Sequence, residues 1–306
     1  MVKAKALKDR KVDFLIVGLG SPKKEHVVSR QNVGSIFADY LANCISMQAL
    51  LLKQGEVQDP VNPVIPPDFK RPAFIRRRDL LSDIHDSEFA LTEADVYTGP
   101  EDEVPEGADA KVHKIYRVVI AKSLSPLQTC GPVVKKLVEE YKIKDIAKQL
   151  IVVLDNNKAN NKGFEGHAAE QNVIDCLGTN DFIRFRLGVG KPNAKYPIEK
   201  HGLRGFNDVP GDVDLVGHSL DITGQALQNY TAFLDVSQTK EKFDSTKKPT
   251  KELRQLPGLL FPVDITDPEE KMSKTEKAAI EKKNSAMKLL IREQLQAKVE
   301  QARLKA

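Results

Sequence analysis

Residues 13–34 read DFLIVGLGSPKKEHVVSRQNVG, and this stretch decides the fold. An apolar run at 14–17 leads into a glycine-bearing turn at 18–22, then into a polar loop and the start of a helical pattern at 29–34. A continuous apolar run that a helix follows is typical of a buried strand in an α/β sheet. Polar groups just beyond the carboxyl end of such a strand are well placed to line a cleft. The stretch therefore predicts a strand, a turn and a helix, with a functional site at the turn.

The same alternation of strands and helices continues along the chain. Further strands are predicted at 116–122, 149–154 and 182–190, and helices at 33–44, 131–141, 172–177 and 226–233. Strands that alternate with helices indicate an α/β fold: a mostly parallel twisted sheet with helices on both faces. Near the end of the chain Met287, Ile291, Leu295 and Val299 recur every four residues, which predicts a long basic amphipathic helix.

Five segments follow from this pattern: a basic N-terminal arm (1–11), an α/β domain in two parts (12–51 and 113–235), an insertion (52–112) and a linker with the C-terminal helix (236–306). The insertion is rich in proline and acidic residues and is longer than an ordinary loop, so it is predicted to be part extended and part disordered. It either binds a partner or is a solvated loop. The C-terminal helix packs on this chain, on a partner helix or along RNA.

The net charge of +4 is unevenly distributed over the 306 residues. Residues 1–11 carry +4 and residues 271–306 carry +6, so that the body, 12–270, carries −6. Basic ends can bind RNA phosphates without sequence preference. The alternative is a solvated tail and a solvated helix face.

Several classes of protein are excluded or disfavoured. The three cysteines, Cys44, Cys130 and Cys176, are far apart, which argues against a zinc knuckle or a disulfide framework and fits a reducing compartment. There is no apolar run near 18 residues, so no membrane span is expected. No P-loop or metal-ligand cluster occurs, and the glycine turn reads G-x-G-x-x-K, so neither a cofactor nor a metal is predicted. The first eleven residues lack the apolar core of a secretory signal and are at best a weak mitochondrial import signal.

Four ordered blocks resemble the bacterial-type peptidyl-tRNA hydrolases. That family shows G-L-x-N-P-G and T-R-H-N-x-G, then K-P-x-T-F-M-N-L-S-G, then H-D-x-x-D and G-H-N-G-L, and last L-G-x-x-x-F-x-R-x-R-x-G-I-G-x-P. The corresponding segments of this chain are 18–34, 122–131, 153–158 with 170–174, and 177–192. The resemblance covers about 13–50 and 113–192 and implies the family's α/β fold. The proposed insertion and the last hundred residues lie outside it.

The resemblance also implies a reaction, cleavage of the ester that joins a peptide to the 3′ ribose of tRNA. Such chemistry needs a base that activates water and a carboxylate that orients the base. In the family the base is the histidine of T-R-H-N, and here Gln31 stands at that position. The orienting carboxylate is matched by Asp155. A carboxamide has no titratable nitrogen near neutral pH, so Gln31 cannot accept a proton from water, and loss of the base should cost about 10²- to 10⁴-fold in rate.

The positions that would hold the substrate or tRNA are also altered. Asn172 matches a family asparagine, whereas Ser21 and Gln128 replace two others. His26 stands for the tyrosine near the CCA-end pocket, and Gln171 for the histidine of G-H-N-G. The full set of predicted substrate- or tRNA-binding residues is Ser21, His26, Leu127, Gln128, Asn172, Arg184 and Arg186.

These substitutions predict a catalytically silent relative that acts as an RNA-associated structural protein of a ribonucleoprotein, for which a mitochondrial ribosome is one host. Its expected partners are tRNA or rRNA, and ribosomal or other ribonucleoprotein proteins that contact 52–112 and the C-terminal helix. The compartment is then mitochondrial, or otherwise cytoplasmic.

A second hypothesis is an active hydrolase with a relocated base, for which His26, His167 and Glu170 are candidates. A third is a soluble factor that holds the tRNA CCA end through Asn172 and Arg184 or Arg186 and releases it uncut. Asp155 has a structural alternative as the cap of the next helix.

Overall fold

The computed structural model describes residues 7–55, 69–100, 103–156, 167–190, 198–206, 212–243 and 264–266. The predicted C-terminal helix and most of the linker before it lie outside these residues, as do 1–6 of the N-terminal arm.

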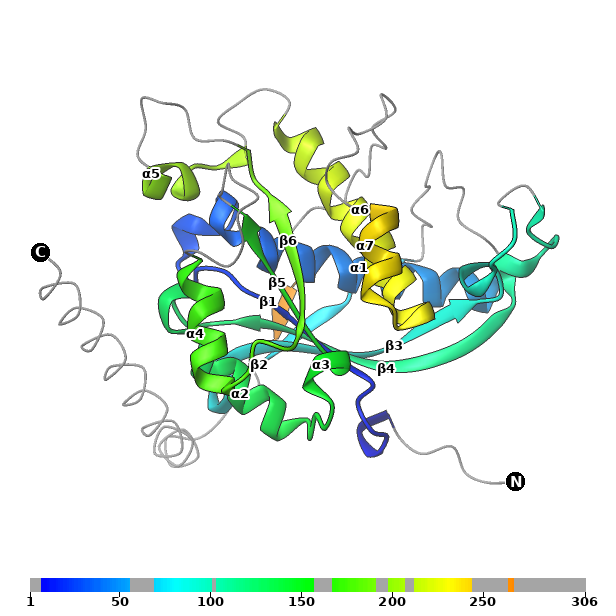
Figure 1. Cartoon of the computed structure of the whole chain (residues 1–306), viewed down its shortest axis with the longest axis horizontal. Coiled ribbons are helices and arrows are strands. Elements are labelled where there is room, and N and C mark those ends of the chain that lie inside the picture. Colours follow the sequence, from blue (N-terminus) through cyan, green and yellow to red (C-terminus); the bar gives the residue numbers. More distant parts are fainter. Residues whose placement is uncertain are drawn as a thin grey trace, which may run out of the picture.

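A seven-stranded sheet in the order β6-β5-β1-β4-β3-β2-β7 forms the centre of the protein (Figure 1). Its strands are β1 (Phe14–Gly18), β2 (Ala73–Arg77), β3 (Ser82–Thr92), β4 (Val112–Ser123), β5 (Leu150–Asn156), β6 (Ile183–Gly188) and β7 (Asp264–Thr266). Strand β1 lies between β4 and β5 and is parallel to both. Strands β5 and β6 are parallel, as are β2 and β7, whereas β3 is antiparallel to its neighbours β2 and β4. The mostly parallel α/β sheet that the sequence predicts is confirmed.

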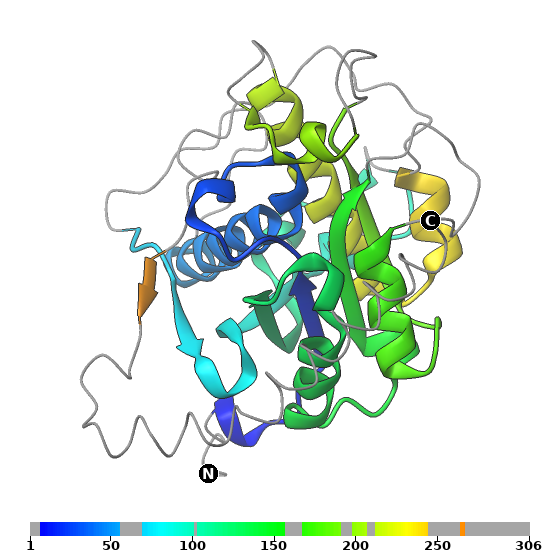
Figure 2. The same ribbon diagram turned by 90° about the vertical axis from the view of Figure 1, so that its left-hand side faces the viewer.

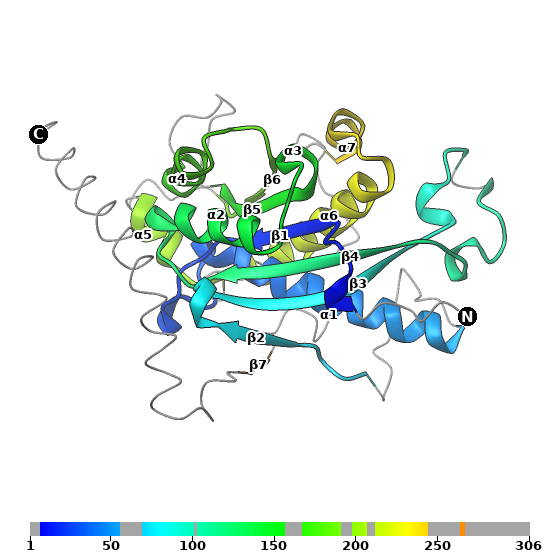
Figure 3. The same cartoon turned by 90° about the horizontal axis from the view of Figure 1, so that it is seen from below.

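Helices cover both faces of the sheet, as predicted (Figure 3). They are α1 (Val33–Gln54), α2 (Gly131–Glu140), α3 (Ile146–Gln149), α4 (Ala168–Leu177), α5 (Ile198–Leu203), α6 (Asp212–Phe233) and α7 (Val236–Phe243). Because side chains alternate along a strand, β1 supplies both cores. Ile16 packs in the cluster with α1 and α6, and Leu15 and Val17 pack in the cluster with α2 and α4.

Helix α1 lies directly against the ends of β1 and β5. A Cβ atom at Gly34 would come within 2.3 Å of the Val153 carbonyl oxygen and 2.5 Å of that of Leu19. Only glycine therefore allows this approach at the start of the helix. By length and composition residues 30–54 could pass for a membrane span, with a mean hydropathy of 1.3. Since 61% of its apolar 18-residue stretch is buried inside the protein, α1 serves as a core helix of the sheet.

Residues 52–112, predicted to be an insertion that is part extended and part disordered, contribute strands to the central sheet. Helix α1 continues to Gln54, and β2 and β3 belong to the central sheet, where β3 pairs with β4 along its whole length. The β3–β4 hairpin projects from the body of the protein (Figures 1 and 3). The proline-rich part, 56–68, lies outside the described residues.

Arginine partners explain why an acidic segment forms a strand of the sheet. Asp83 accepts two hydrogen bonds from Arg76 at 2.8 and 3.0 Å, and Asp86 accepts two from Arg117 at 3.0 and 2.6 Å. Glu88 pairs with Arg10 near the N-terminal end of the described chain. The carboxylates of β3 are thus neutralised by arginines of β2, β4 and the N-terminal segment, and charge composition alone could not indicate this.

Two further differences concern the second half of the chain. The helix predicted at 226–233 is the end of the longer α6, and α7 occupies the beginning of the predicted linker. The short helix α5 lies beside the loop that follows β1 (Figure 2). The chain after α5 contacts this loop directly: Arg30 N donates to the Arg204 carbonyl at 3.0 Å, and Phe206 N donates to that of Val28 at 3.3 Å.

Candidate functional site

The candidate site lies at the carboxyl edge of the parallel strands. Strands β1, β4, β5 and β6 run in the same direction, so the segments that follow them meet at one edge of the sheet. The turn after β1 is tied to β5 by a hydrogen bond from Leu19 N to the Val153 carbonyl at 2.9 Å. Most of the predicted site residues lie at or near this edge, although they come from separate parts of the sequence. Arg184 lies further back, near the start of β6, where it pairs with Val152.

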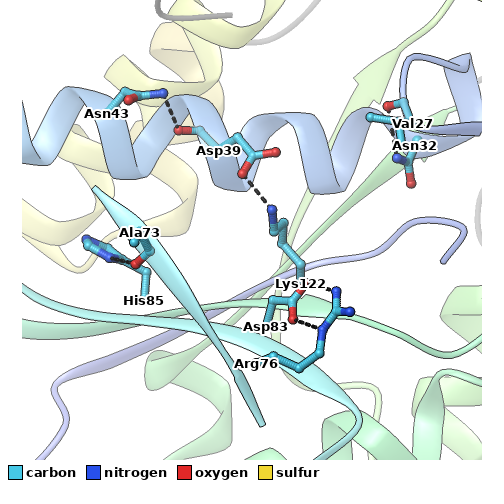
Figure 4. Close-up of polar contacts among 9 residues, drawn as sticks. All are labelled: Val27, Asn32, Asp39, Asn43, Ala73, Arg76, Asp83, His85 and Lys122. Carbon is cyan, nitrogen blue, oxygen red and sulfur yellow. Dashed lines mark hydrogen bonds and ion pairs between the residues drawn. The ribbon is translucent and has the colours of Figure 1, made fainter. Parts of the chain in front are cut away.

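Three predicted residues lie together in the loop after β1. Gln31 Nε2 is 3.3 Å from His26 Nδ1, and Ser21 Oγ is 3.0 Å from the same nitrogen. Asn32 braces the loop, since its Oδ1 accepts from Ser21 N at 2.8 Å and its Nδ2 donates to the Val27 carbonyl at 3.0 Å (Figure 4). The position of the family's base is therefore occupied by an amide that contacts a neighbouring imidazole.

Asp155 contacts a histidine of the next segment. His167 Nε2 lies 3.0 Å from Asp155 Oδ1, and Asp155 is 1% exposed at the end of β5. His167 itself occupies the N-cap position of α4, where no side-chain capping hydrogen bond is made. The buried Nδ1 of His167 has no hydrogen-bond partner among the residues that the structure describes. A carboxylate that accepts the Nε2 proton leaves Nδ1 as the basic nitrogen, so the pair has the chemistry of an oriented base.

Asn172 has a structural contact at this edge. It is 2% exposed, and its Oδ1 accepts a hydrogen bond from Gly131 N, at the first residue of α2, at 2.7 Å. The amide thus satisfies a backbone donor of a helix start, which no earlier turn can do. Leu127 and Gln128 lie nearby in a short 3₁₀ turn between β4 and α2 that contacts α4.

Arg184 and Arg186 converge on Glu170. Arg186 donates to the Glu170 carboxylate from Nε at 3.0 Å and from Nη2 at 2.6 Å, and Arg184 Nε lies 3.2 Å from Glu170 Oε1. The Arg184 guanidinium also stacks on the Phe182 ring at 4.4 Å. Burial lowers the pKa of Arg184, while the neighbouring Glu170 charge opposes this shift. The two arginines predicted to contact tRNA thus share one acidic partner within the chain.

A buried ion pair next to the site was not predicted. Lys122 Nζ lies 2.7 Å from Asp39 Oδ1 and 4.2 Å from the centre of the Phe74 ring (Figure 4). In the sheet register Lys122 pairs with Gly18, the last residue of β1, so the ion pair lies next to the turn that follows β1. The sequence contained a signal for this pair, because Asp39 lies on the buried face of an apolar helix and Lys122 lies at the end of an apolar strand.

Comparisons with known proteins point to one group of enzymes. Residues 101–251 match the family model for peptidyl-tRNA hydrolase. The peptidyl-tRNA hydrolase of Caldicellulosiruptor bescii is 26% identical over 205 residues, which are 64% of this chain and 80% of that protein. That of Thermodesulfovibrio yellowstonii is 28% identical over 201 residues, which are 63% of this chain and 80% of that protein. By sequence, the chain is therefore similar to the peptidyl-tRNA hydrolases.

Solved structures show the same fold. The crystal structure of peptidyl-tRNA hydrolase from Acinetobacter baumannii superimposes with a TM-score of 0.51 at 16% identity. The match covers 77% of this chain and 97% of that chain. A mutant of the same enzyme gives a TM-score of 0.52 at 17% identity. Nearly the whole family fold is therefore present here, with additional chain around it.

Proposed function

We propose that this protein is a catalytically silent member of the family that serves as an RNA-associated structural component of a ribonucleoprotein. The observation that carries the proposal is Gln31 at the position of the family's base, with its amide on His26 at 3.3 Å. A carboxamide cannot take a proton from water near neutral pH. The fold is retained, and in this proposal the protein uses it as a surface for RNA, while the chemistry at that position is lost.

The charge distribution supports an RNA partner. Residues 1–11 and 271–306 carry +4 and +6, and such segments bind phosphates whatever the base sequence. The proposed contacts for proteins of the same particle are the C-terminal segment and residues 52–112, which include β3 of the projecting hairpin (Figure 3). A mitochondrial ribosome is the host that we propose, with the mitochondrion as the compartment.

The first test is hydrolysis of an N-acetyl-aminoacyl-tRNA by the purified protein, beside the Gln31→His variant. We expect no turnover by the wild type and co-sedimentation of the protein with ribosomal particles. Turnover by the wild type would exclude a silent protein. A monomer that binds neither tRNA, rRNA nor ribosomes would exclude the structural role. Binding that requires an intact tRNA 3′ end would instead indicate a factor that holds the CCA end and releases it uncut.

One observation favours a second candidate function, an active peptidyl-tRNA hydrolase with a relocated base. Of the three candidate bases, His167 has the suitable contacts, because Asp155 orients its Nε2 at 3.0 Å. His26 instead has its Nδ1 on Ser21 and Gln31, and its Nε2 is 3.9 Å from the exposed Glu25. Glu170 has both oxygens on arginines.

In this second function substrate binding has to expose His167 Nδ1, which is buried in the free protein. This nitrogen then removes a proton from water as the oxygen attacks the ester carbonyl, and Asp155 stabilises the imidazolium. The same proton then passes to the 3′ oxygen as the ester bond breaks, which releases the free peptide and tRNA. His167→Gln should lower turnover by about 10²- to 10⁴-fold. His113→Gln, an exposed histidine, is the matched control. Loss of turnover in His26→Ala with full turnover in His167→Gln would reject this assignment.

A further inference from the structure

One carboxylate is buried between the two arginines of the binding edge. The Glu170 side chain is 4% exposed, against 18% for Arg184 and 37% for Arg186. Both of its oxygens are engaged: Oε1 contacts Arg186 Nη2 at 2.6 Å and Arg184 Nε at 3.2 Å, and Oε2 accepts from Arg186 Nε at 3.0 Å. The Arg186 contact is bidentate, the geometry in which guanidinium and carboxylate bind most strongly.

The position of Glu170 makes this contact a property of the fold. Glu170 lies in the first turn of α4, where an acidic side chain is favoured by the helix dipole, and it faces β6, which carries both arginines. In the motif G-H-N-G-L, which aligns with 170–174, the first position is glycine. Glycine has no side chain, so the carboxylate is an addition in this chain.

Charge and geometry together define what the pair can bind. Two guanidinium groups and one carboxylate leave a charge of +1 beside a solvent-accessible Arg186. Bidentate arginine contacts suit a phosphate as well as a carboxylate, so a phosphodiester would compete for the same donors. A phosphate that approaches Arg186 therefore has to displace Glu170 or bear the repulsion of its negative charge.

We propose that Glu170 is an internal competitor for phosphate, which occupies Arg184 and Arg186 and limits the affinity of this edge for the RNA backbone. This inference rests on RNA binding as the proposed function and names the residue that regulates it. RNA that supplies enough further contacts displaces Glu170, whereas RNA that reaches only this edge does not. Glu170 thus acts as a specificity-determining residue.

The test uses the full chain and its Glu170→Gln variant. RNA affinity is measured by fluorescence anisotropy with tRNA over a series of salt concentrations. We expect binding about fivefold tighter at low salt, and a salt dependence steeper by about 0.7–0.9 for each additional phosphate that the variant neutralises. The matched control is Glu140→Gln, which removes a half-exposed carboxylate that contacts Arg77 at 3.0 Å away from the site. Equal increases in affinity for the two variants would overturn the proposal, because they would reflect net charge alone.

A double-mutant cycle tests whether Glu170 acts through Arg186. Arg186→Gln should change tRNA affinity by less than about twofold in the wild type but by about fivefold in the Glu170→Gln background. Equal effects in both backgrounds would overturn the competitor role.

Inorganic phosphate separates this inference from the proposed function. Phosphate should raise the Tm of Glu170→Gln more than that of the wild type. If it does so while neither protein binds RNA, the inference stands and the RNA-binding function fails. If the wild type binds RNA and Glu170→Gln changes neither RNA nor phosphate binding, the inference fails and the proposed function stands.

Discussion

At the scale of single residues, Lys122 and Asp39 form an ion pair whose side chains are 10% and 11% exposed. Lys122→Met leaves the buried Asp39 carboxylate without its lysine, so this variant should lower the free energy of unfolding by about 3–5 kcal/mol. Replacement of both, as Lys122→Met with Asp39→Leu, should cost less than either single change. Urea unfolding measures these values.

The matched control for this pair is Lys111→Met, which breaks an exposed contact with Glu93 at 3.7 Å. Its cost should be about 0–1 kcal/mol. If Lys122→Met lowered the free energy of unfolding no more than this control, the ion pair would contribute little to the stability of the protein.

His85 predicts a pH dependence of stability. Burial lowers the pKa of His85 below its ordinary value of 6.5, and its ring lies 5.6 Å from that of Phe74. As the pH falls through 6.5, the unfolded chain binds a proton that the folded chain excludes, so the free energy of unfolding decreases. This decrease continues until the pH reaches the lowered pKa of the folded state.

Replacement of this histidine should flatten the pH dependence. His85→Gln should remove up to about 1.4 kcal/mol per pH unit from the slope of unfolding free energy between about pH 6.5 and the lowered pKa. Urea unfolding at a series of pH values measures the slope. His113→Gln, at an exposed position, serves as the control for the loss of a histidine. Identical slopes for wild type and His85→Gln would show that His85 titrates alike in both states.

At the scale of the elements, the contact of α1 with β1 and β5 depends on Gly34. A Cβ atom there would lie 2.3 Å from the Val153 carbonyl oxygen, so Gly34→Ala forces the helix away from the strand. We expect a loss of about 1–3 kcal/mol in unfolding free energy, the usual cost of overpacking. Thermal or urea unfolding provides the measurement.

Gly224→Ala is the matched control for this substitution. Gly224 lies within α6, and a Cβ atom there would be 3.5 Å from the Tyr40 ring, an ordinary contact. Because alanine is more favourable than glycine in a helix interior, this variant should be more stable than the wild type by about 0.5–1 kcal/mol. If Gly224→Ala lost as much unfolding free energy as Gly34→Ala, the close approach of α1 to β1 and β5 at Gly34 would not explain the cost.

The elements differ in how well the sequence predicts them. Strands β1 and β5 are buried on both faces, so each appears as an uninterrupted apolar run and was predicted. Strand β3 was missed because its acidic residues resemble a solvated loop. The arginines that neutralise these acidic residues lie on β2, β4 and the N-terminal segment. Arg117 of β4, for example, pairs with Asp86.

At the scale of the whole molecule, the basic C-terminal segment should dominate the salt dependence of RNA binding. The combined variant Lys274→Gln, Lys277→Gln and Lys282→Gln should weaken tRNA binding and reduce its salt slope by about 0.7–0.9 for each phosphate that is no longer neutralised. Fluorescence anisotropy over a salt series measures both quantities.

The control for this variant removes three exposed lysines from the body, as Lys111→Gln, Lys135→Gln and Lys144→Gln. Both variants lose the same net charge. Equal slopes in the two would show that net charge, and not the C-terminal segment, determines binding.

The residues of the candidate site stay a prediction, and the contacts among them follow from the sequence only where the residues are neighbours in the chain. Ser21, His26 and Gln31 are close in sequence, and the structure brings them together. The pairing of Asp155 with His167 and of Glu170 with the arginines was not predictable. These partners lie on separate elements whose distance depends on how the chain returns to the sheet.

The sequence by itself determined the class of fold, because apolar periodicity and glycine turns are local properties of the chain. It also determined that Gln31 cannot act as a base, since that follows from the chemistry of one side chain. Only the tertiary structure decided which charges meet. Lys122 and Asp39 are 83 residues apart, and the arginines that neutralise β3 come from β2, β4 and the N-terminal segment. Such contacts depend on strand order and register, which the pairing of distant segments establishes.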